Sequence, residues 1–562
     1  MGQRRGIELA MLKHKLATIL EQAAKEAQAK GLLPSIALPD IILEHPQNPE
    51  HGDYASSLPL KMGRAARSEP MGIAETLATL LPHIEEVERV SVAAPGFINF
   101  FLTGTWLTEQ VEEILRASEF YGNLDLGRGA KVQVEFVSVN PTGPIHVGHG
   151  RGAVLGSTMA NVLSAAGYSV EREYYVNDAG NQMDAFYRSL YCRYIQALGK
   201  ECELPADGYR GSYPVELARE IISEKGAAFL DMPPEDATRE LGRIGLEKTI
   251  TAIRSDLEAL GVTFDVWFNE HDLFYNGQYE RSMALLREGG HIEQREGAQW
   301  FVSTALGEDK DNVLVRSNGV PTYFASDVAY HYNKFLERSF DKVINIWGAD
   351  HQGHVSRMKA VLGALGIDPE RLKIIISQMV TLRRGEDILR VSKRTGELIT
   401  LSELLEEVGP DVCRFFFLAR SADSQMDFDL ELAKRESNDN PVYYVQYAHA
   451  RIASILRLAR ERNIDYSNGD VSLLTTEAEL ELLRKMVLLP ELVELTAMNL
   501  EPHHLPYFAQ ELATAFHSFY KQCRVVTDDE VLTKARLKLV KSAQIVFSRT
   551  LGLMGMTVPE RM

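Results

Sequence analysis

Two strand–loop–helix units constrain the fold of this chain more than any other feature. In the first, apolar and polar residues alternate over 132–136, a turn follows, and an apolar helical pattern runs until Gly167. In the second, the apolar run 343–347 precedes a helical stretch that ends near Leu365. Strands joined through helices run parallel, and helices cover both faces of a parallel sheet. Because about 200 residues separate the units, we expect one Rossmann-like parallel sheet interrupted by insertions.

The length and composition point to a multidomain α/β protein. At about 150 residues per domain, 562 residues suggest about three to four domains. Hydrophobic residues make up 45% and charged residues 25%, which excludes a largely disordered chain. We expect a small N-terminal α/β domain over 1–120, the Rossmann-like parallel-sheet domain over 121–403 and an all-α helical bundle over 404–562. Within the sheet domain, the patterns indicate a helical insertion at about 187–260 and strands at 292–323.

Charge and cysteine usage narrow the function classes. Sixty basic against 78 acidic residues give a net charge of −18, which excludes a uniformly basic nucleic-acid coat but permits a local basic stripe. The four cysteines are widely spaced and none belongs to a Cys-x-x-Cys pair, so neither a disulfide scaffold nor a zinc ribbon is expected. We find no signal-peptide pattern and no long apolar run. We therefore expect a cytoplasmic protein without a membrane span.

The strongest local motif is His146-Val147-Gly148-His149-Gly150, which opens the helix after the first strand. A helix N-terminus offers free N–H groups and the positive end of the dipole, which suits a phosphate. Gly148 allows close approach to the backbone, and both imidazoles can donate to phosphate oxygens. Alone, the motif is equally compatible with two solvated histidines.

A second motif, 390–396 (RVSKRTG), follows the strands of the second unit. Its lysine and arginines can clamp a pyrophosphate, although a solvated basic loop is equally compatible with the segment alone. Together the two motifs allow a nucleotide to lie across the switch point of the sheet. Gly199-Lys200 is followed by Glu201, so the chain lacks a Walker A motif at its best candidate position.

These two motifs resemble the His-x-Gly-His and K-M-S-K-S signatures of class I aminoacyl-tRNA synthetases, and further segments resemble the arginyl-tRNA synthetase family. The resemblance covers nearly the whole chain. The segments that carry it are 52–55, 135–146, 173–182, 323–327, 347–351, 411–418, 440–451 and 559–562.

The resemblance implies ligation of L-arginine to tRNA(Arg) with ATP and Mg²⁺, through an arginyl-adenylate. It implies that 1–120 contacts the tRNA elbow, that 121–403 is catalytic and that 404–562 binds the anticodon. Family members usually need bound tRNA even for adenylate formation. We expect no zinc and a monomeric enzyme.

The resemblance also assigns roles around the nucleotide. His146 and His149 would stabilise charge on the α-phosphate, and Lys393 would hold the leaving pyrophosphate with help from Ser392. The residues expected to contact ATP are His146, Gly148, His149, Gly150, Asp350, His351, Val391, Lys393 and Arg394. Asp350, His351 and His354 offer fewer ligands than a convincing zinc set, so we favour a nucleotide role for His351.

For the amino acid, the resemblance implies that Asp327 faces the guanidinium and that Tyr323 lies against the side chain, with Asn140 near the α-amino group. A carboxylate suits a guanidinium because it accepts a bidentate pair of hydrogen bonds. By itself Asp327 is more typical of a helix cap or a helix-surface acid, because capping aspartates are common. Weaker candidates, which can also form turn hydrogen bonds, are Asn177, Asp178 and Gln182.

Two basic stretches are candidates for tRNA phosphates. Residues 531–559 contain no Asp or Glu, and Lys534, Lys538 and Lys541 fall on one predicted helix face. Arg451 begins the other stretch. For each stretch, a merely solvated helix face is an equal alternative.

Two other function classes stay open. Gly148-x-Gly150-x-x-Ala153 fits the fingerprint of an NAD-dependent dehydrogenase, although 140–147 separate these glycines from their strand. A non-catalytic tRNA-binding paralogue is the other class, and such a protein would be expected to have lost its phosphate-handling residues. Among synthetases, the cysteine enzyme would need a zinc set that the cysteine spacing does not supply.

Overall fold

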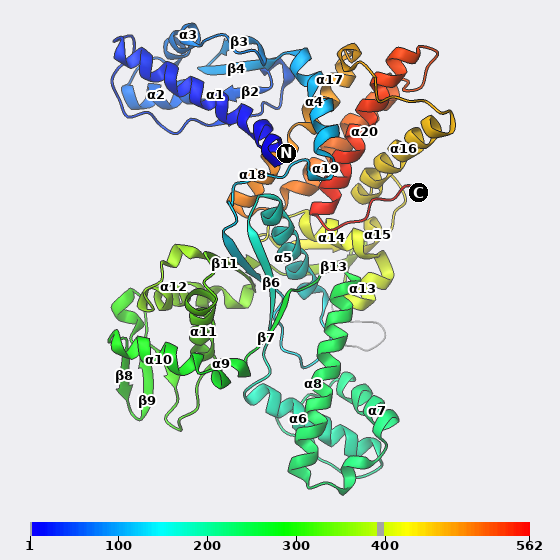
Figure 1. The fold of residues 1–562 in the computed structure, drawn as a ribbon. Helices are drawn as coiled ribbons and strands as arrows, with labels where there is room; N and C mark the ends of the chain where they lie inside the picture. Colours follow the sequence, from blue (N-terminus) through cyan, green and yellow to red (C-terminus); the bar gives the residue numbers. More distant parts are fainter. Residues whose placement is uncertain (1–2, 390–397) are drawn as a thin grey trace.

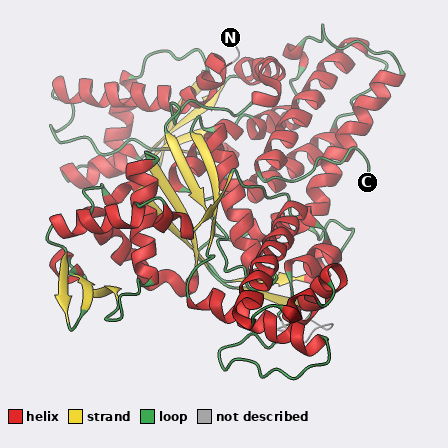
Figure 2. Ribbon diagram, turned by 60° about the horizontal axis from the view of Figure 1, so that its bottom comes forward, coloured by secondary structure: helices red, strands yellow, loops and turns green. Residues whose placement is uncertain are grey.

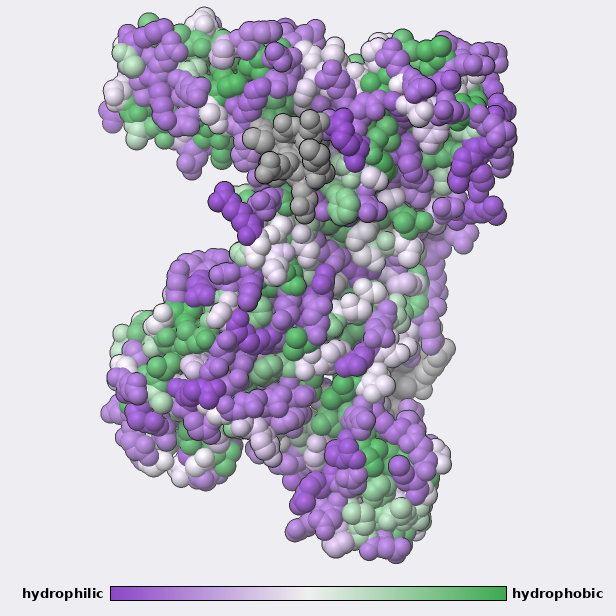
Figure 3. All heavy atoms as spheres, in the orientation of Figure 1, coloured by the Kyte–Doolittle hydropathy of each residue, from purple (hydrophilic) through white to green (hydrophobic). Residues whose placement is uncertain are grey.

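The computed structural model describes residues 3–389 and 398–562. The chain forms an N-terminal lobe, a central sheet with two inserted lobes, and a helical C-terminal region (Figure 1). A wide recess separates the N-terminal lobe from the lobe that contains α10 to α12, and hydrophilic residues dominate the outer surfaces of both (Figure 3). The predicted fold class, a multidomain α/β protein with a Rossmann-like parallel sheet and a helical C-terminal region, is confirmed.

The central sheet has five parallel strands in the order β12-β11-β5-β6-β7 and lies among helices (Figure 2). Both predicted strand–helix units contribute to it. Its strands are β5 (Lys131–Glu135), β6 (Ser169–Val176), β7 (Val266–Asn269), β11 (Lys342–Gly348) and β12 (Leu372–Ser377).

Helix α5 (Val147–Ala165) joins β5 to β6 and is buried along nearly its whole length. Gly156 permits this close packing, because a Cβ atom there would lie 2.1 Å from the Phe136 ring. The buried Arg151 donates from its guanidinium to three backbone carbonyls, which tie α5 to the chain after β12. These carbonyls belong to Gln378 (2.9 Å), Ser421 (2.7 Å) and Ser424 (2.8 Å).

Two insertions interrupt the sheet. The insertion between β6 and β7 is helical and consists of α6 (Asn181–Ala197), α7 (Tyr213–Lys225) and α8 (Pro234–Ala259). The insertion between β7 and β11 contains an antiparallel three-stranded sheet, with β8 (Ile292–Arg295), β9 (Ala298–Phe301) and β10 (Asn312–Val315). Its helices are α9 (His271–Tyr275), α10 (Gln278–Glu288) and α11 (Tyr323–Tyr332), which continues into the π-helical turn η5 (Asn333–Glu337).

The N-terminal lobe is a four-stranded antiparallel sheet covered by helices. Its strands pair in the order β1-β2-β4-β3: β1 (Leu43–Glu44), β2 (Tyr54–Ser56), β4 (Phe97–Leu102) and β3 (Val87–Ala93). Its helices are α1 (Gln3–Ala29), α2 (Leu58–Ala66) and α3 (Pro70–Leu80).

The next helix, α4 (Gly104–Ala117), packs against α17 (Glu477–Met486) and α20 (Glu530–Leu553) of the C-terminal region. The segment that follows α4 also belongs to this packing. Tyr121 is fully buried and its hydroxyl donates to the Met486 carbonyl at 3.3 Å. The segment from α4 to Tyr121 therefore packs with the C-terminal helices. Local sequence patterns do not reveal this contact between distant segments.

The C-terminal region is built mainly from helices. After η6 (Ala349–His354) and α12 (Val355–Ala364), strands β13 (Val380–Arg384) and β14 (Asp387–Leu389) form a small sheet with β15 (Met426–Asp429). The region after 404 is thus not entirely helical. Its further helices are α13 (Leu401–Val408), α14 (Pro410–Leu418), α15 (Leu430–Ala433), α16 (Pro441–Glu461), α18 (Leu489–Asn499) and α19 (His504–Gln522). Over the described ranges, we find no helix long and apolar enough to cross a membrane.

Candidate active site

The candidate site lies where the direction of the sheet reverses. After β5 the chain proceeds through α5 to β6, on one side, whereas β11 and β12 extend the sheet on the other side. The carboxyl ends of the neighbouring strands β5 and β11 therefore flank the topological switch point, where open α/β sheets bind ligands. The structure brings the turn at His146 and the turn at Asp350 together at this edge.

Both histidines of the first motif are fixed by the backbone. The Nδ1 atom of His146 accepts from the Gly148 N–H at 3.2 Å, and that of His149 accepts from the His146 N–H at 3.3 Å. The centres of the His146 and His149 rings lie 3.6 Å apart. Because each Nδ1 is an acceptor, a neutral ring must carry its hydrogen on Nε2.

The two imidazoles are also neutral. Burial lowers the pKa of His146, and burial together with the His146 charge lowers the pKa of His149 to about 3. The pair therefore offers two N–H donors at neutral pH, with no positive charge. Such preoriented donors can stabilise negative charge that grows on a phosphate.

The two glycines of this motif differ in their surroundings. Gly148 is exposed, and a Cβ atom there would lie 3.0 Å from the His146 ring. Gly150 is buried, and a Cβ atom there would lie 2.9 Å from Leu401 and 3.2 Å from Phe417. Packing therefore explains the glycine at 150, where we had expected nucleotide contact.

Four predicted nucleotide residues lie outside the described residues: Val391, Ser392, Lys393 and Arg394. The chain that follows them lies beside the histidine turn. The Ile399 carbonyl accepts from the Val147 N–H at 3.2 Å, and the Leu401 N–H donates to the Ile145 carbonyl at 2.9 Å. The backbone thus brings residues 399–401 to the N-terminus of α5.

Asp350 and His351 are exposed in η6, directly after β11. The His351 Nε2 atom lies 3.5 Å from an Asp350 carboxylate oxygen, while the rings of His351 and His354 are 5.6 Å apart. Among residues 3–389 and 398–562, the only cluster with metal-ligand spacing lies elsewhere, at the start of α19. It consists of Glu501, His503 and His504.

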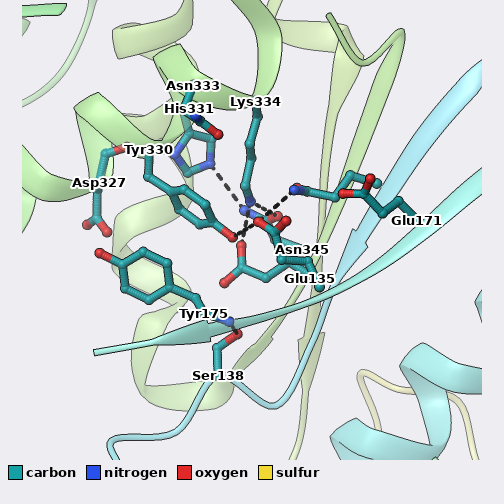
Figure 4. A network of polar contacts seen from close by, with 12 residues as sticks. Glu135, Ser138, Glu171, Tyr175, Asp327, Tyr330, His331, Asn333, Lys334 and Asn345 are labelled. Atoms are coloured by element: carbon teal, nitrogen blue, oxygen red, sulfur yellow. Dashed lines mark hydrogen bonds and ion pairs between the residues drawn. The ribbon is translucent and has the colours of Figure 1, made fainter. Parts of the chain in front are cut away.

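Tyr323 and Asp327 lie one turn apart on α11 and share a face. Burial, which is the largest cause, and the charges of Glu135 and Glu270 together raise the pKa of Asp327 to about 7, against the opposing charges of Arg357 and Lys334. Figure 4 shows the Asp327 carboxylate and the Tyr175 hydroxyl pointing toward one another.

Glu135 and Glu270 were not predicted from the sequence. Glu135 is the last residue of β5, Glu270 directly follows β7, and both are buried. Burial and the Asp178 charge raise the pKa of Glu270. Carboxylates that raise one another's pKa favour a bound cation, and a guanidinium matches their geometry. The available sequence signal was their position at the carboxyl ends of parallel strands.

The weaker pocket candidates divide into two groups. Asn140 donates to Gln182. With its side-chain amide turned over to match its neighbours, Asn177 donates through its nitrogen to Glu270 at 2.8 Å. These amides therefore lie at the rim of the acidic pocket. Asp178 instead accepts from the His271 N–H at 3.1 Å and from the His271 ring, so it fixes the start of α9.

One lysine of the expected basic face of α20 is not available at the surface. Lys538 is buried and pairs with Glu112 of α4 at 2.5 Å, so it is not available to tRNA. Lys534 and Lys541 are half-buried, and Lys541 donates to Gln544 at 2.9 Å. The prediction missed Glu112 because this acid comes from a helix more than 400 residues earlier in the chain.

Arg451 lies in an aromatic cluster between α16 and α19. Its guanidinium carbon lies 4.6 Å from the Tyr447 ring centre and 4.4 Å from that of Tyr520. Tyr443 stacks on Tyr447 at 6.0 Å. Aromatic rings combined with an arginine provide a surface on which nucleobases can stack.

Family comparisons agree with this geometry over most of the chain. Residues 12–102 match the arginyl tRNA synthetase N terminal domain, residues 110–414 match the class I (R) tRNA synthetase catalytic domain, and residues 445–562 match the DALR anticodon binding domain. The parallel sheet, the histidine turn at its switch point and the catalytic-domain match define a class I aminoacyl-tRNA synthetase.

Individual relatives narrow this class. The chain is 59% identical over 543 residues to the arginine–tRNA ligase of Dehalococcoides mccartyi, and the matched region covers 97% of this chain and 98% of that protein. It is 49% identical over 557 residues to the arginine–tRNA ligase of Moorella thermoacetica, covering 98% and 99%. The solved arginyl-tRNA synthetase of Thermus thermophilus shares the fold, with a TM-score of 0.78 at 24% identity over 98% of this chain and 100% of that one. The chain belongs to the arginyl-tRNA synthetase family, as its motifs predicted.

Proposed function

We propose that this enzyme ligates L-arginine to tRNA(Arg) with ATP, through an arginyl-adenylate. The observation that carries this proposal is the acidic pocket around Asp327, which lies at the same edge of the sheet as the two fixed imidazoles. An arginine held by its guanidinium in this pocket can extend its α-carboxylate toward a nucleotide at the switch point. The dehydrogenase alternative is not favoured, because Gly150 of its fingerprint is buried against other side chains.

In the first step, an oxygen of the arginine carboxylate attacks the α-phosphorus of ATP, and the bond from this phosphorus to the pyrophosphate oxygen breaks. Negative charge accumulates on the α-phosphate and on the leaving group. His146 and His149 would donate to the α-phosphate through Nε2, while Lys393 and Ser392 would hold the pyrophosphate. ATP would bring Mg²⁺ with its phosphates, as part of the substrate.

In the second step, a hydroxyl at the 3′ end of tRNA(Arg) attacks the adenylate carbonyl, and AMP leaves.

In the arginine pocket, Asp327 and Glu135 would accept from the guanidinium, Tyr323 would cover the side chain, and Asn140 would lie near the α-amino group. A bidentate, charge-assisted pair favours arginine over lysine, whose ammonium is a point charge.

The aromatic cluster at Arg451 supports a contact with the tRNA anticodon region, since arginine and tyrosine suit exposed bases. We do not include Lys538 in this surface. All proposed groups come from one chain, which supports a monomeric enzyme. The free cysteines suit a reducing compartment such as the cytoplasm.

Formation of AMP from ATP, measured with total tRNA and arginine, tests this function. We expect AMP only when both arginine and tRNA are present. AMP release that does not depend on arginine would contradict the proposal.

A further inference from the structure

A lysine is fully buried directly behind the acidic pocket. Lys334 lies in the π-helical turn that continues α11, and its ammonium donates to Glu135 at 2.5 Å and to the Asn345 side-chain oxygen at 3.0 Å. It also lies 4.0 Å from the centre of the Tyr330 ring. Burial of a lysine is costly unless its ammonium is paired and hydrogen-bonded. The contacts with Glu135 and Asn345 offset this cost.

A series of hydrogen bonds leads from Lys334 to Asp327, and each of them pairs one donor with one acceptor (Figure 4). Because the Asn345 oxygen accepts from Lys334, its amide nitrogen donates to His331 Nε2 at 3.1 Å. The other ring nitrogen, Nδ1, donates to the Asp327 backbone carbonyl at 2.8 Å. Burial lowers the pKa of His331 to about 3, so this ring stays neutral with one donor and one acceptor.

A second buried anchor holds the same helix. Tyr330, next to His331, donates to Glu173 on β6, and Glu173 also accepts from Gln133 at 2.8 Å and pairs with Arg338. Helix α11 is thus fixed to β5 and β11 through Lys334 and to β6 through Tyr330. The Gln133 side-chain oxygen is buried without a partner, whereas its amide nitrogen is paired with Glu173. Buried networks of this kind favour one arrangement of the elements they join.

We propose that Lys334 is a positioning residue of the arginine site, which holds Glu135 and Asp327 at the separation that one guanidinium requires. The inference rests on the proposed function and deepens it. Glu135 comes from β5 and Asp327 from α11, 192 positions later in the sequence. The path Glu135–Lys334–Asn345–His331–Asp327 connects them through side chains alone, apart from the final carbonyl.

Lys334 also supplies the positive charge that faces Glu135. The other groups that interact electrostatically with Glu135 are Asp327 and Tyr330 of α11 and Tyr175 of β6. None of these three is a cation. Removal of the ammonium would leave Glu135 without the cation that faces it, and Asp327 would keep the charge of Arg357 but lose that of Lys334, so its pKa would rise.

The test is the arginine KM in aminoacylation, measured from pH 5.5 to 9 for the wild type, Lys334→Met and Lys334→Arg. Lys334 is one of two cations that lower the pKa of Asp327, so we expect Lys334→Met to move the midpoint of the KM–pH curve upward, by up to about one unit. At pH 7 its arginine KM should rise by about tenfold or more, with the KM for ATP within about twofold. Lys334→Arg keeps the charge and should keep the wild-type midpoint.

Asn345→Leu serves where Lys334→Met does not fold, because it retains both charges and removes only the Asn345 hydrogen bonds to Lys334 and His331. We expect a raised arginine KM, an unchanged midpoint and an unchanged KM for ATP. Lys359→Met, which removes an exposed lysine paired with Glu370, is the control and should match the wild type.

The outcomes separate the two proposals. A wild type that does not use arginine would overturn the proposed function and this inference with it. A wild type that charges arginine, alongside Lys334→Met or Asn345→Leu variants with unaltered arginine KM, would overturn the positioning role alone. An equal loss toward arginine and ATP would also contradict it, because that is the signature of general destabilisation.

Discussion

The nucleotide side and the amino-acid side of the site use opposite electrostatic designs. At the nucleotide side, the backbone of one turn fixes two half-buried neutral imidazoles. At the amino-acid side, side chains from three separate elements hold buried charges, with Lys334 against Glu135. Charge that appears during a reaction is best met by fixed dipoles, whereas a permanent cation such as guanidinium is best selected by permanent anions. The comparison predicts different responses to mutation and to pH on the two sides.

The largest effect is expected at the nucleotide side. His149→Ala removes a donor that acts on charge formed in the transition state, and should lower the rate of adenylate formation by about 10²–10³-fold. The arginine KM should change little, since His149 is not part of the acidic pocket. Single-turnover measurements separate the two quantities. If His149→Ala kept the rate of adenylate formation but lost arginine affinity, His149 would belong to the amino-acid side and our assignment would be wrong.

The next effect concerns the amino-acid side. Asp327→Asn keeps the shape but removes the charge, and should raise the arginine KM by about 10–10²-fold, the cost of weakening hydrogen bonds to a charged group. Asp178→Asn is the matched control, because the Asp178 oxygens already accept from His271. If Asp178→Asn impaired arginine use more than Asp327→Asn, our choice between the two acids would be incorrect.

A smaller effect is the pH dependence. The pKa of Asp327 is raised to about 7, so this carboxylate is lost as the pH falls through 7 and is present above it. The arginine KM should therefore rise by up to about tenfold per unit below pH 7. The pKa of His149 is lowered to about 3, so this imidazole should stay neutral between pH 5.5 and 8. A step in the KM for ATP within this range that His149→Ala abolishes would contradict a neutral His149.

The smallest effect concerns tRNA. Arg451→Ala should raise the tRNA KM by about tenfold or less, through lost stacking with bases or a lost phosphate contact. A phosphate contact would also lower the slope of log K against log salt by about one unit. Lys538→Met is the control, since its partner is Glu112. An equal loss of tRNA affinity in both variants would show that Arg451 acts only through the fold.

The sequence predicted the sheet, its two strand–helix units and the histidine turn, because each of these features is local. It did not identify Glu135 as a site residue, because this glutamate resembled any polar residue in a strand of alternating polar and apolar positions. It also missed Lys334 as its partner, since 199 positions separate them. The same limitation affected α20, whose lysines resembled a solvated face until α4 supplied Glu112. Pairing between distant segments, which local periodicity does not encode, decided each of these cases.

The central claim is that this pocket selects arginine. Charging of total tRNA with each of the twenty amino acids, at equal concentrations and in parallel, tests it most directly. We expect arginine to be charged faster than every other amino acid, including lysine, and we expect Asp327→Asn to reduce this preference. Faster charging of any other amino acid by the wild-type enzyme would contradict it.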